Sequence, residues 1–351
     1  MTLIGYLTRT HFAEAAIEDA LPEEIGAVPR ALVLIDDEPG SRAALDRVRE
    51  ALSRTQLGLV RAPSRAPSRD ATGPILACLG DARTATLVAI GGAAAVGQAR
   101  LVAEHVARQG GGLTLIAVPV GLFDLGLARQ VRPTDGRPAT CPRPDKVIAD
   151  PTVLAHAPVR HMAASAMEIL VHAIEAYASL SYNPPADGLA LEAVRRLTRW
   201  LPVALGAPGD REALRELMAA AMTTGLAMEK AVGGVDALAH PITPELGSGF
   251  LPGDLHVPLL AAMAEFNAQA VGDRYAALAP TLARREGDLS FSREIGVFAR
   301  GIGMPTSLRE IGINPDGFDR FAEMAAKDPA ALANPRRLTP VDCRRILEAA
   351  W

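Results

Sequence analysis

The sequence predicts two domains: a doubly wound α/β domain over residues 1–150 and an all-helical (all-α) domain over residues 151–351. In the first part, short apolar runs alternate with helical patterns, which is typical of a parallel sheet covered by helices on both faces. After Asp150-Pro151 the apolar residues recur at helical spacing, and hardly any β-branched run remains. A chain of 351 residues, 49% of them hydrophobic, is long enough for two such cores.

Three apolar runs in the first domain each end near Asp, Gly or Pro and predict buried parallel strands: Ala31 to Ile35, Leu87 to Ile90, and Leu113 to Pro119. Helical spacing over Ala43 to Leu52 and Gln98 to Arg108 places helices between the strands. This alternation predicts a Rossmann-like sheet. Residues 61–72, rich in Pro, Ser and Arg, predict a loop.

Helix-breaking residues divide the second domain into several helices. The breaks are expected at Asn183-Pro184-Pro185, Ala207-Pro208-Gly209, Pro241 to Gly253, and Asn334-Pro335. Each break would end one helix and set the direction of the next.

Composition excludes several kinds of partner. The net charge of −4 and the pI near 6.0 lack the basic excess that a nucleic-acid surface needs, so a small-molecule partner is expected. Three widely separated cysteines fit neither a disulfide framework nor a cysteine metal site. We find no signal-peptide pattern and no apolar run of eighteen residues, and therefore expect a cytoplasmic protein without a membrane span.

One stretch contains two residues that could bind a metal ion or a substrate. Residues 167–177 read Met-Glu-Ile-Leu-Val-His-Ala-Ile-Glu-Ala-Tyr. Glu168 and His172 lie four residues apart, so a helix places them on one face, one turn apart. A carboxylate and an imidazole in that arrangement can bind one metal ion or one substrate atom together.

This stretch resembles the metal-binding helix of the iron-containing alcohol dehydrogenases, which reads Met-Asp-Ala-Leu-Thr-His-Ala-Ile-Glu-Ala-Tyr. Four further segments resemble the family in the same order: Ala237-Leu-Ala-His240-Pro241, Ala264-Glu-Phe-Asn267, Met304-Pro-Thr-Ser-Leu-Arg-Glu-Ile-Gly312, and Asn334-Pro-Arg-Arg-Leu-Thr-Pro340. The chain is similar, nearly end to end, to iron-containing alcohol dehydrogenases and maleylacetate reductases, which are related to dehydroquinate synthase. The resemblance implies their two-domain fold and a homodimer.

The resemblance implies that a nicotinamide dinucleotide, if bound, meets a Gly-Gly-Gly-Ser loop, which here is Gly91-Gly92-Ala93-Ala94. The extra methyl and the lost hydroxyl weaken this site. Asp36, after the first predicted strand, can accept hydrogen bonds from a ribose diol, or can be a turn or cap residue. We expect Asp36, Gly91 and Gly92 to be the cofactor-binding residues if NAD(P) binds at all.

A second cofactor segment has lost its hydroxyl groups. The family's Pro-Thr-Thr-Ala-Gly-Thr-Gly-Ser-Glu is matched here by Pro119-Val-Gly-Leu-Phe-Asp-Leu-Gly-Leu127. We expect a mostly apolar wall that suits a hydrocarbon-like ligand. Asp124 within this wall would serve as an acid or a base if buried, and as an ordinary loop carboxylate if exposed.

The metal site implied by the resemblance is altered as well. The family's Asp, His, His and His correspond to Glu168, His172, Asp236, and Pro252 or Gly253. His256 lies three or four residues beyond the vacated position, so a Glu/His/Asp/His set for Fe or Zn could be rebuilt from it. The alternative is a site without metal.

Five side chains are candidates for catalysis: Glu168, His172, Asp236, His240 and Asp124. His240 matches a family histidine that works near the substrate, although a histidine before proline is often structural.

Because the losses fall on cofactor and metal contacts, we expect a non-redox enzyme. It would bind an apolar organic substrate between the domains and catalyse a cyclisation, isomerisation or rearrangement in biosynthesis. We expect that neither NAD(P) nor Fe or Zn is required. Two alternatives remain: an NAD(P)-dependent reductase or dehydrogenase of the maleylacetate reductase or alcohol dehydrogenase type, and a non-catalytic scaffold.

Overall fold

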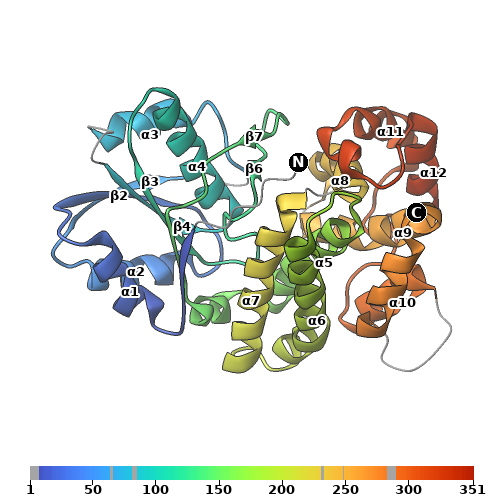
Figure 1. The fold of residues 1–351 in the computed structure, drawn as a ribbon, viewed down its shortest axis with the longest axis horizontal. Helices are drawn as coiled ribbons and strands as arrows, with labels where there is room; N and C mark the ends of the chain where they lie inside the picture. Colours follow the sequence, from blue (N-terminus) through green and yellow to red (C-terminus); the bar gives the residue numbers. More distant parts are fainter. Residues whose placement is uncertain (1–7, 64–65, 81–84, 231–232, 248, 283–289) are drawn as a thin grey trace. The chain divides into compact units, whose positions relative to one another are not determined.

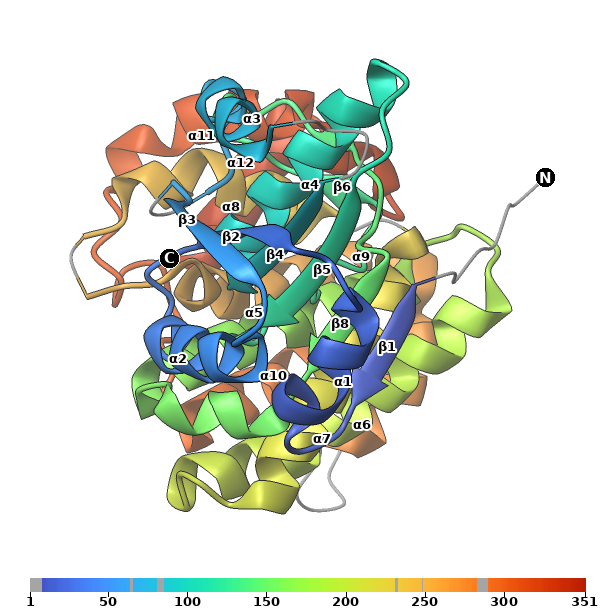
Figure 2. The same ribbon diagram turned by 90° about the vertical axis from the view of Figure 1, so that its left-hand side faces the viewer.

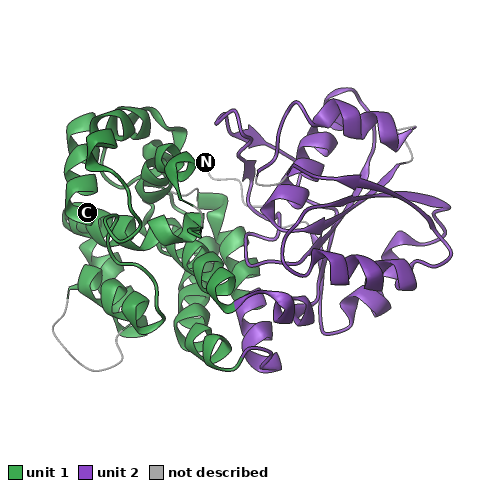
Figure 3. Ribbon diagram, turned by 180° about the vertical axis from the view of Figure 1, so that it is seen from behind, with its two compact units in different colours: residues 1–4, 159–207, 219–351 green, residues 5–158, 208–218 purple. Residues whose placement is uncertain are grey.

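A computed structural model describes residues 8–63, 66–80, 85–230, 233–247, 249–282 and 290–351 of the chain. The chain forms two compact units (Figure 3). We call residues 5–158 and 208–218 the N-terminal unit, and residues 159–207 and 219–351 the C-terminal unit.

The N-terminal unit contains a six-stranded parallel sheet with the strand order β1-β8-β5-β4-β2-β3 (Figure 2). Its strands are β1 (Arg9–Phe12), β2 (Arg30–Ile35), β3 (Gln56–Arg61), β4 (Thr86–Gly91), β5 (Thr114–Pro119) and β8 (Lys146–Ala149). A small antiparallel ribbon consists of β6 (Gln130–Val131) and β7 (Ala139–Thr140).

The three predicted strands are the central strands β2, β4 and β5, and each lies within one residue or so of its predicted bounds. All six residues of β4 are buried, as expected for a strand covered on both faces. The sequence did not indicate β1 and β3, which are the edge strands and are partly exposed. It did not indicate the short β8 either.

Helices cover both faces of this sheet. On one face α1 (Ala16–Ile25) packs against α2 (Ser41–Ala51), and on the other face α3 (Thr72–Leu79) packs against α4 (Ala93–Arg108) (Figure 1). The predicted doubly wound α/β fold is therefore confirmed. Strands β2 and β4 are neighbours, and Ile35 lies opposite Ile90. The chain order reverses here, and the carboxyl ends of such strands are the usual ligand position in this fold class.

Within its described residues the C-terminal unit contains helices and no strands. The long helices from residue 159 onward are α5 (Val159–Ala178), α6 (Pro184–Gly206), α7 (Arg211–Ala227), α8 (Gly234–Ile242), α9 (Pro252–Leu282), α10 (Phe291–Gly301), α11 (Phe318–Lys327) and α12 (Pro340–Ala350). The short 3₁₀ segments of the chain are η1 (Pro151–His156), η2 (Met228–Lys230), η3 (Thr243–Glu245), η4 (Pro315–Gly317) and η5 (Pro329–Ala333).

The four predicted breaks coincide with helix ends. Asn183 caps α6, where its side chain accepts a hydrogen bond from the backbone N–H of Ala186. Pro184 follows at the first helical position, where it costs no hydrogen bond. Among the described residues, no helix combines the length and the apolar character that crossing a bilayer requires.

Candidate metal centre and nucleotide turn

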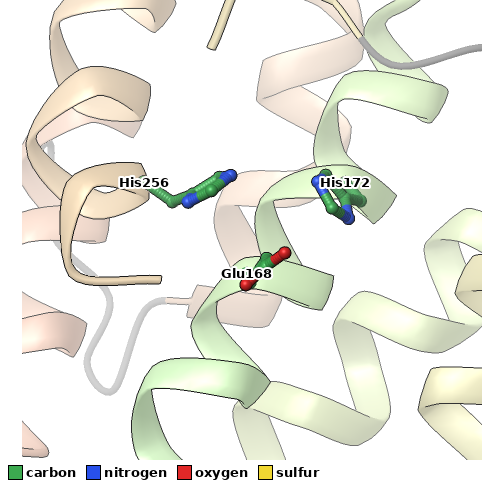
Figure 4. A group of neighbouring side chains, drawn as sticks. All are labelled: Glu168, His172 and His256. Carbon is green, nitrogen blue, oxygen red and sulfur yellow. The ribbon is translucent and has the colours of Figure 1, made fainter. Parts of the chain in front are cut away.

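Helix α5 places Glu168 and His172 one turn apart, as the spacing predicts. Both side chains face His256 of α9 (Figure 4). Each of the three residues can offer one ligand atom such that all three atoms lie within 4.8 Å of one another. His256 is buried, and the other two side chains are partly buried.

Asp236 of α8 joins the two histidines. Its Oδ1 lies 3.0 Å from His172 Nε2 and 3.1 Å from His256 Nε2. The two imidazole rings meet edge to face, with centroids 5.5 Å apart and an angle of 86° between their planes. The structure thus brings together Glu168, His172, Asp236 and His256 from three helices, and we call these four residues the donor cluster.

A second contact of His256 determines which of its ring nitrogens carries a hydrogen. Its Nδ1 lies 2.9 Å from the carbonyl oxygen of Pro252, which can only accept, so Nδ1 carries a hydrogen. In the neutral ring, Nε2 then presents a lone pair to Asp236 Oδ1, which is also an acceptor. Two acceptors at this distance require a proton or a cation between them or beside them.

The electrostatics of the donor cluster favour positive charge. Burial disfavours a charged ring at His172, but Asp236, Glu168 and Glu175 outweigh it and raise the pKa of His172 to about 9. The pKa of His256 is raised in the same way: burial opposes the shift, and Asp236 and Glu168 outweigh it. Burial alone would raise the pKa of Asp236, but the two histidines hold it well below its usual range.

The donor cluster fits a divalent metal ion. Nitrogen and oxygen ligands lie about 2.0–2.2 Å from Zn²⁺, so neighbouring ligand atoms on one ion are roughly 3.0–3.5 Å apart. The contacts of 3.0 and 3.1 Å on Asp236 Oδ1 agree with that separation. Two imidazoles and two carboxylates form a donor set that suits Fe²⁺ or Zn²⁺.

A close approach between helices explains how His256 reaches the cluster. A Cβ atom added to Gly253 would lie 1.9 Å from the carbonyl oxygen of Ala164, so α9 and α5 meet at their backbones there. His256 lies one turn after Gly253, and Glu168 lies one turn after Ala164. The vacated family position, Pro252 or Gly253, is therefore a contact point between helices, and the next turn supplies the histidine.

Glu175 fixes the start of α8. Its carboxylate accepts hydrogen bonds from the backbone N–H groups of Gly233 (3.1 Å) and Val235 (2.8 Å). A carboxylate at this helix end satisfies donors that have no partner within the helix and interacts favourably with the helix dipole. Burial and the nearby Asp236 raise the pKa of Glu175 to about 7. Glu175 therefore holds the turn that leads into Asp236.

His240, four residues after Asp236 on α8, pairs with a residue that the sequence did not indicate. Its Nδ1 lies 3.0 Å from Asp328 Oδ2. The His240 side chain is 27% exposed, and that of Asp328 is 9% exposed. The pair is separated by 88 residues in sequence, and no spacing pattern could have revealed it.

In the N-terminal unit, the glycine turn after β4 surrounds the carboxylate of Asp36. Asp36 Oδ2 accepts hydrogen bonds from the backbone N–H groups of Gly92 (2.9 Å) and Ala95 (3.0 Å), at the start of α4. Oδ1 accepts from the hydroxyl of Ser41 and from the N–H of Glu38. Gly91 has φ of +146°, and a Cβ there would lie 2.1 Å from Asp36 Oδ1. The turn-and-cap alternative thus describes the contacts of Asp36, whose pKa burial raises.

This turn fits a dinucleotide diphosphate through its backbone. Ala93 and Ala94 follow Gly92 as the first two residues of α4, where N–H groups have no partner within the helix. Two carboxylates oppose an anion there. Besides Asp36, the carboxylate of Glu38 lies 3.1 Å from an added Cβ at Gly92. The backbone of this turn could hold a diphosphate, and the two carboxylates beside it would oppose the binding of that anion.

The apolar segment 119–127 differs from the expected wall. Leu122 is 6% exposed, and Leu125 and Leu127 are at most 1% exposed, so these side chains are packed rather than presented to a ligand. Asp124 is half-buried, and its Oδ1 accepts a hydrogen bond from the backbone N–H of Gly126 at 2.7 Å. Its carboxylate therefore closes a local turn in the N-terminal unit.

The chain is similar to known proteins in both sequence and fold. Residues 162–351 match the family model for the C-terminal part of the Fe-containing alcohol dehydrogenase family. A 4-hydroxybutyrate dehydrogenase of Cupriavidus necator is 27% identical, over 99% of this chain and 99% of that protein. Maleylacetate reductase 1 of Rhodococcus opacus is 28% identical, over 94% and 90%. A crystal structure of an iron-containing alcohol dehydrogenase has a TM-score of 0.85 at 19% identity, covering 100% of this chain and 99% of the other, which shows the shared fold.

These findings correct two expectations. The expected non-redox cyclisation, isomerisation or rearrangement is wrong, because the relatives are named dehydrogenases and reductases. The expectation that no cofactor is required is wrong as well. The family is named for its iron, and a dehydrogenation or reduction needs an electron acceptor or donor. Substitutions within both sites had suggested loss of the cofactors, whereas the names of the family and of the relatives point to iron and to redox chemistry.

The resemblance inferred from five sequence segments is confirmed. The matching family model covers 190 of the 351 residues, from residue 162 to residue 351, and includes all four residues of the donor cluster. The chain belongs to the Fe-containing alcohol dehydrogenase family.

Proposed function

We propose that this protein is an NAD(P)-dependent oxidoreductase that interconverts a small alcohol and its carbonyl compound, with a divalent metal ion at the donor cluster. One observation carries the proposal: Asp236 Oδ1 lies 3.0 and 3.1 Å from the Nε2 atoms of two histidines that come from different helices. The names of the relatives support the redox class.

Each residue has a distinct role in this proposal. Glu168, His172, Asp236 and His256 would hold the metal. When bound, the metal supplies Lewis-acid polarisation of the substrate oxygen, and the nicotinamide supplies or accepts hydride. His240 exchanges the proton of the substrate hydroxyl at its Nε2, since its Nδ1 is engaged by Asp328.

The N-terminal unit provides the cofactor turn in this proposal. Gly91 and Gly92 keep the backbone open, and the first N–H groups of α4 bind the diphosphate. Asp36 lies at the end of β2, where this fold class places the acceptor for the ribose diol. Its bond to the Ser41 hydroxyl is one that a ribose hydroxyl could replace.

The proposed substrate class is based on two relatives that match over nearly the whole chain. Their names specify 4-hydroxybutyrate and maleylacetate, both of which are carboxylic acids. We therefore propose a small hydroxy acid, or the corresponding oxo acid, as the first substrate class to assay. The homodimer implied by the resemblance stays a prediction, which light scattering would test.

The experiment follows NADH or NADPH at 340 nm with protein reconstituted in Fe²⁺ or Zn²⁺, using 4-hydroxybutyrate in one direction and its aldehyde in the other. The expected result is turnover that His172→Ala lowers by at least roughly 100-fold, because the metal loses a ligand. His105→Ala removes an exposed histidine of α4 and is the matched control, with unchanged turnover. Absence of turnover with both nucleotides in the metal-loaded protein, across hydroxy and oxo acids, would contradict the proposal.

A further inference from the structure

Outside the donor cluster, the largely buried carboxylate of Asp328 contacts a proposed catalytic group. Asp328 Oδ2 lies 3.0 Å from His240 Nδ1. We propose that Asp328 is a positioning residue that fixes the tautomer of His240, with hydrogen on Nδ1 and a lone pair on Nε2. This inference rests on the proposed function for its catalytic consequence, and on the structure alone for the tautomer.

Asp328 itself is held firmly. Its backbone N–H donates to the carbonyl oxygen of Ala325 at the end of α11, at 3.0 Å. Its Oδ1 accepts a hydrogen bond from the backbone N–H of Ala330, at 2.8 Å, and caps η5. Pro329 follows directly and restricts the backbone further. With Oδ1 engaged, Oδ2 is directed at His240 and cannot rotate away without loss of the cap.

The tautomer follows from hydrogen-bond chemistry. A carboxylate only accepts, so the nitrogen that faces Asp328 carries the hydrogen. In the neutral ring, Nε2 is then the basic atom. His240 lies one helical turn after Asp236, which places both side chains on the same face of α8.

This arrangement supports transfer of a proton from the substrate hydroxyl to His240. As the alcohol is oxidised, its O–H bond breaks and an N–H bond forms at His240 Nε2, while the hydride leaves with the cofactor. The imidazolium that results is stabilised by the Asp328 carboxylate, which remains unprotonated. In the opposite tautomer, Nε2 would carry hydrogen and could not take the proton.

Asp328→Asn separates the positioning role from the capping role. Asparagine caps helices as well as aspartate does, so η5 keeps its cap through the amide oxygen. The amide NH₂ then faces His240 Nδ1 and favours hydrogen on Nε2 instead. Asp342→Asn is the matched control. It neutralises another capping aspartate of the C-terminal unit, at the start of α12, and that aspartate bonds to Thr339 rather than to a histidine.

The direct readout is the ¹⁵N spectrum of protein labelled at histidine, with the His240 signal assigned by its absence in His240→Gln. In the neutral ring we expect Nδ1–H in the native protein and in Asp342→Asn, and Nε2–H in Asp328→Asn. We also expect kcat to fall roughly 10- to 100-fold in Asp328→Asn with little change in the KM of the nucleotide. An Nε2–H tautomer in the native protein, or an unchanged kcat in Asp328→Asn, would overturn the proposal. Lack of any turnover alongside the expected tautomers would instead refute the redox function.

Discussion

Gly253→Ala perturbs the geometry of the donor cluster without replacing any of its four residues. The added Cβ would lie 1.9 Å from the carbonyl oxygen of Ala164 and 2.6 Å from its carbonyl carbon. Both are backbone atoms, and Cβ contacts below 3.0 Å are essentially never seen, so α9 and α5 must separate by at least 3.0 − 1.9 = 1.1 Å. Metal sites tolerate ligand distances within about 0.2 Å, so His256 would leave bonding range.

Two measurements test this reasoning. Titration calorimetry with Zn²⁺ should show at least a roughly 10-fold weaker affinity, and denaturant unfolding of the metal-free protein should show a loss of about 1–3 kcal/mol from overpacking. Gly272→Ala is the control, and it lies in α9 beyond the kink at Val271. A Cβ there meets no atom within 4 Å, so metal affinity should be unchanged and stability equal or up to about 1 kcal/mol higher. Native metal affinity in Gly253→Ala would refute the account of how His256 reaches the site.

Three further perturbations follow from the same geometry. Glu175→Gln should lower the free energy of unfolding in urea by about 1–3 kcal/mol and weaken metal binding, because its NH₂ would face a backbone N–H at the start of α8. Native values for both would show that the hydrogen bonds of Glu175 to the start of α8 are unimportant. His172 has a folded pKa of about 9 against an ordinary value of 6.5, since nearby carboxylates outweigh burial. Protonated His172 therefore contributes fully to the stability of the metal-free protein below about pH 6.5, and this contribution is lost as the pH rises to about 9, whereas stabilisation by metal grows over that range. Melting temperatures from about pH 6 to 9.5, measured with and without metal, check both trends. Parallel curves would speak against a shared site. Glu38→Gln should tighten NADH binding about 2- to 5-fold in a fluorescence titration at low salt, because the substitution removes a negative charge beside Gly92 and Gly121. An unchanged affinity would show that the Glu38 carboxylate does not oppose NADH binding.

Local sequence patterns predict the central strands of the sheet and several helix ends. The runs that became β2, β4 and β5 are buried over nearly their whole length, so apolar character alone identified them. The edge strand β3 is a mixture of exposed and partly exposed residues without a buried run and includes Gly58, and both features weaken its strand signal. Helix ends were predicted where proline or glycine fixes the backbone, as at Pro184 and Pro252.

The candidate site was predictable only where local spacing or the family resemblance reached it. Glu168 and His172 came from their spacing on one helix, and His256 came from its position just beyond the vacated family position. The contact of Gly253 with Ala164 and the pairing of Asp328 with His240 depend on tertiary packing of distant segments, which no local pattern encodes. The expected loss of cofactors followed from substitutions at single positions, whereas Glu168, His172 and His256 come together only in the fold.

Metal content measures the central claim most directly. The native protein, purified without chelators and reconstituted anaerobically with Fe²⁺ or Zn²⁺, should retain one ion per chain after desalting, as determined by mass spectrometry of the metals. Asp236→Asn should retain far less, because Asp236 Oδ1 contacts both histidines of the cluster. A native protein that retains no more metal than Asp236→Asn under these conditions would contradict the account.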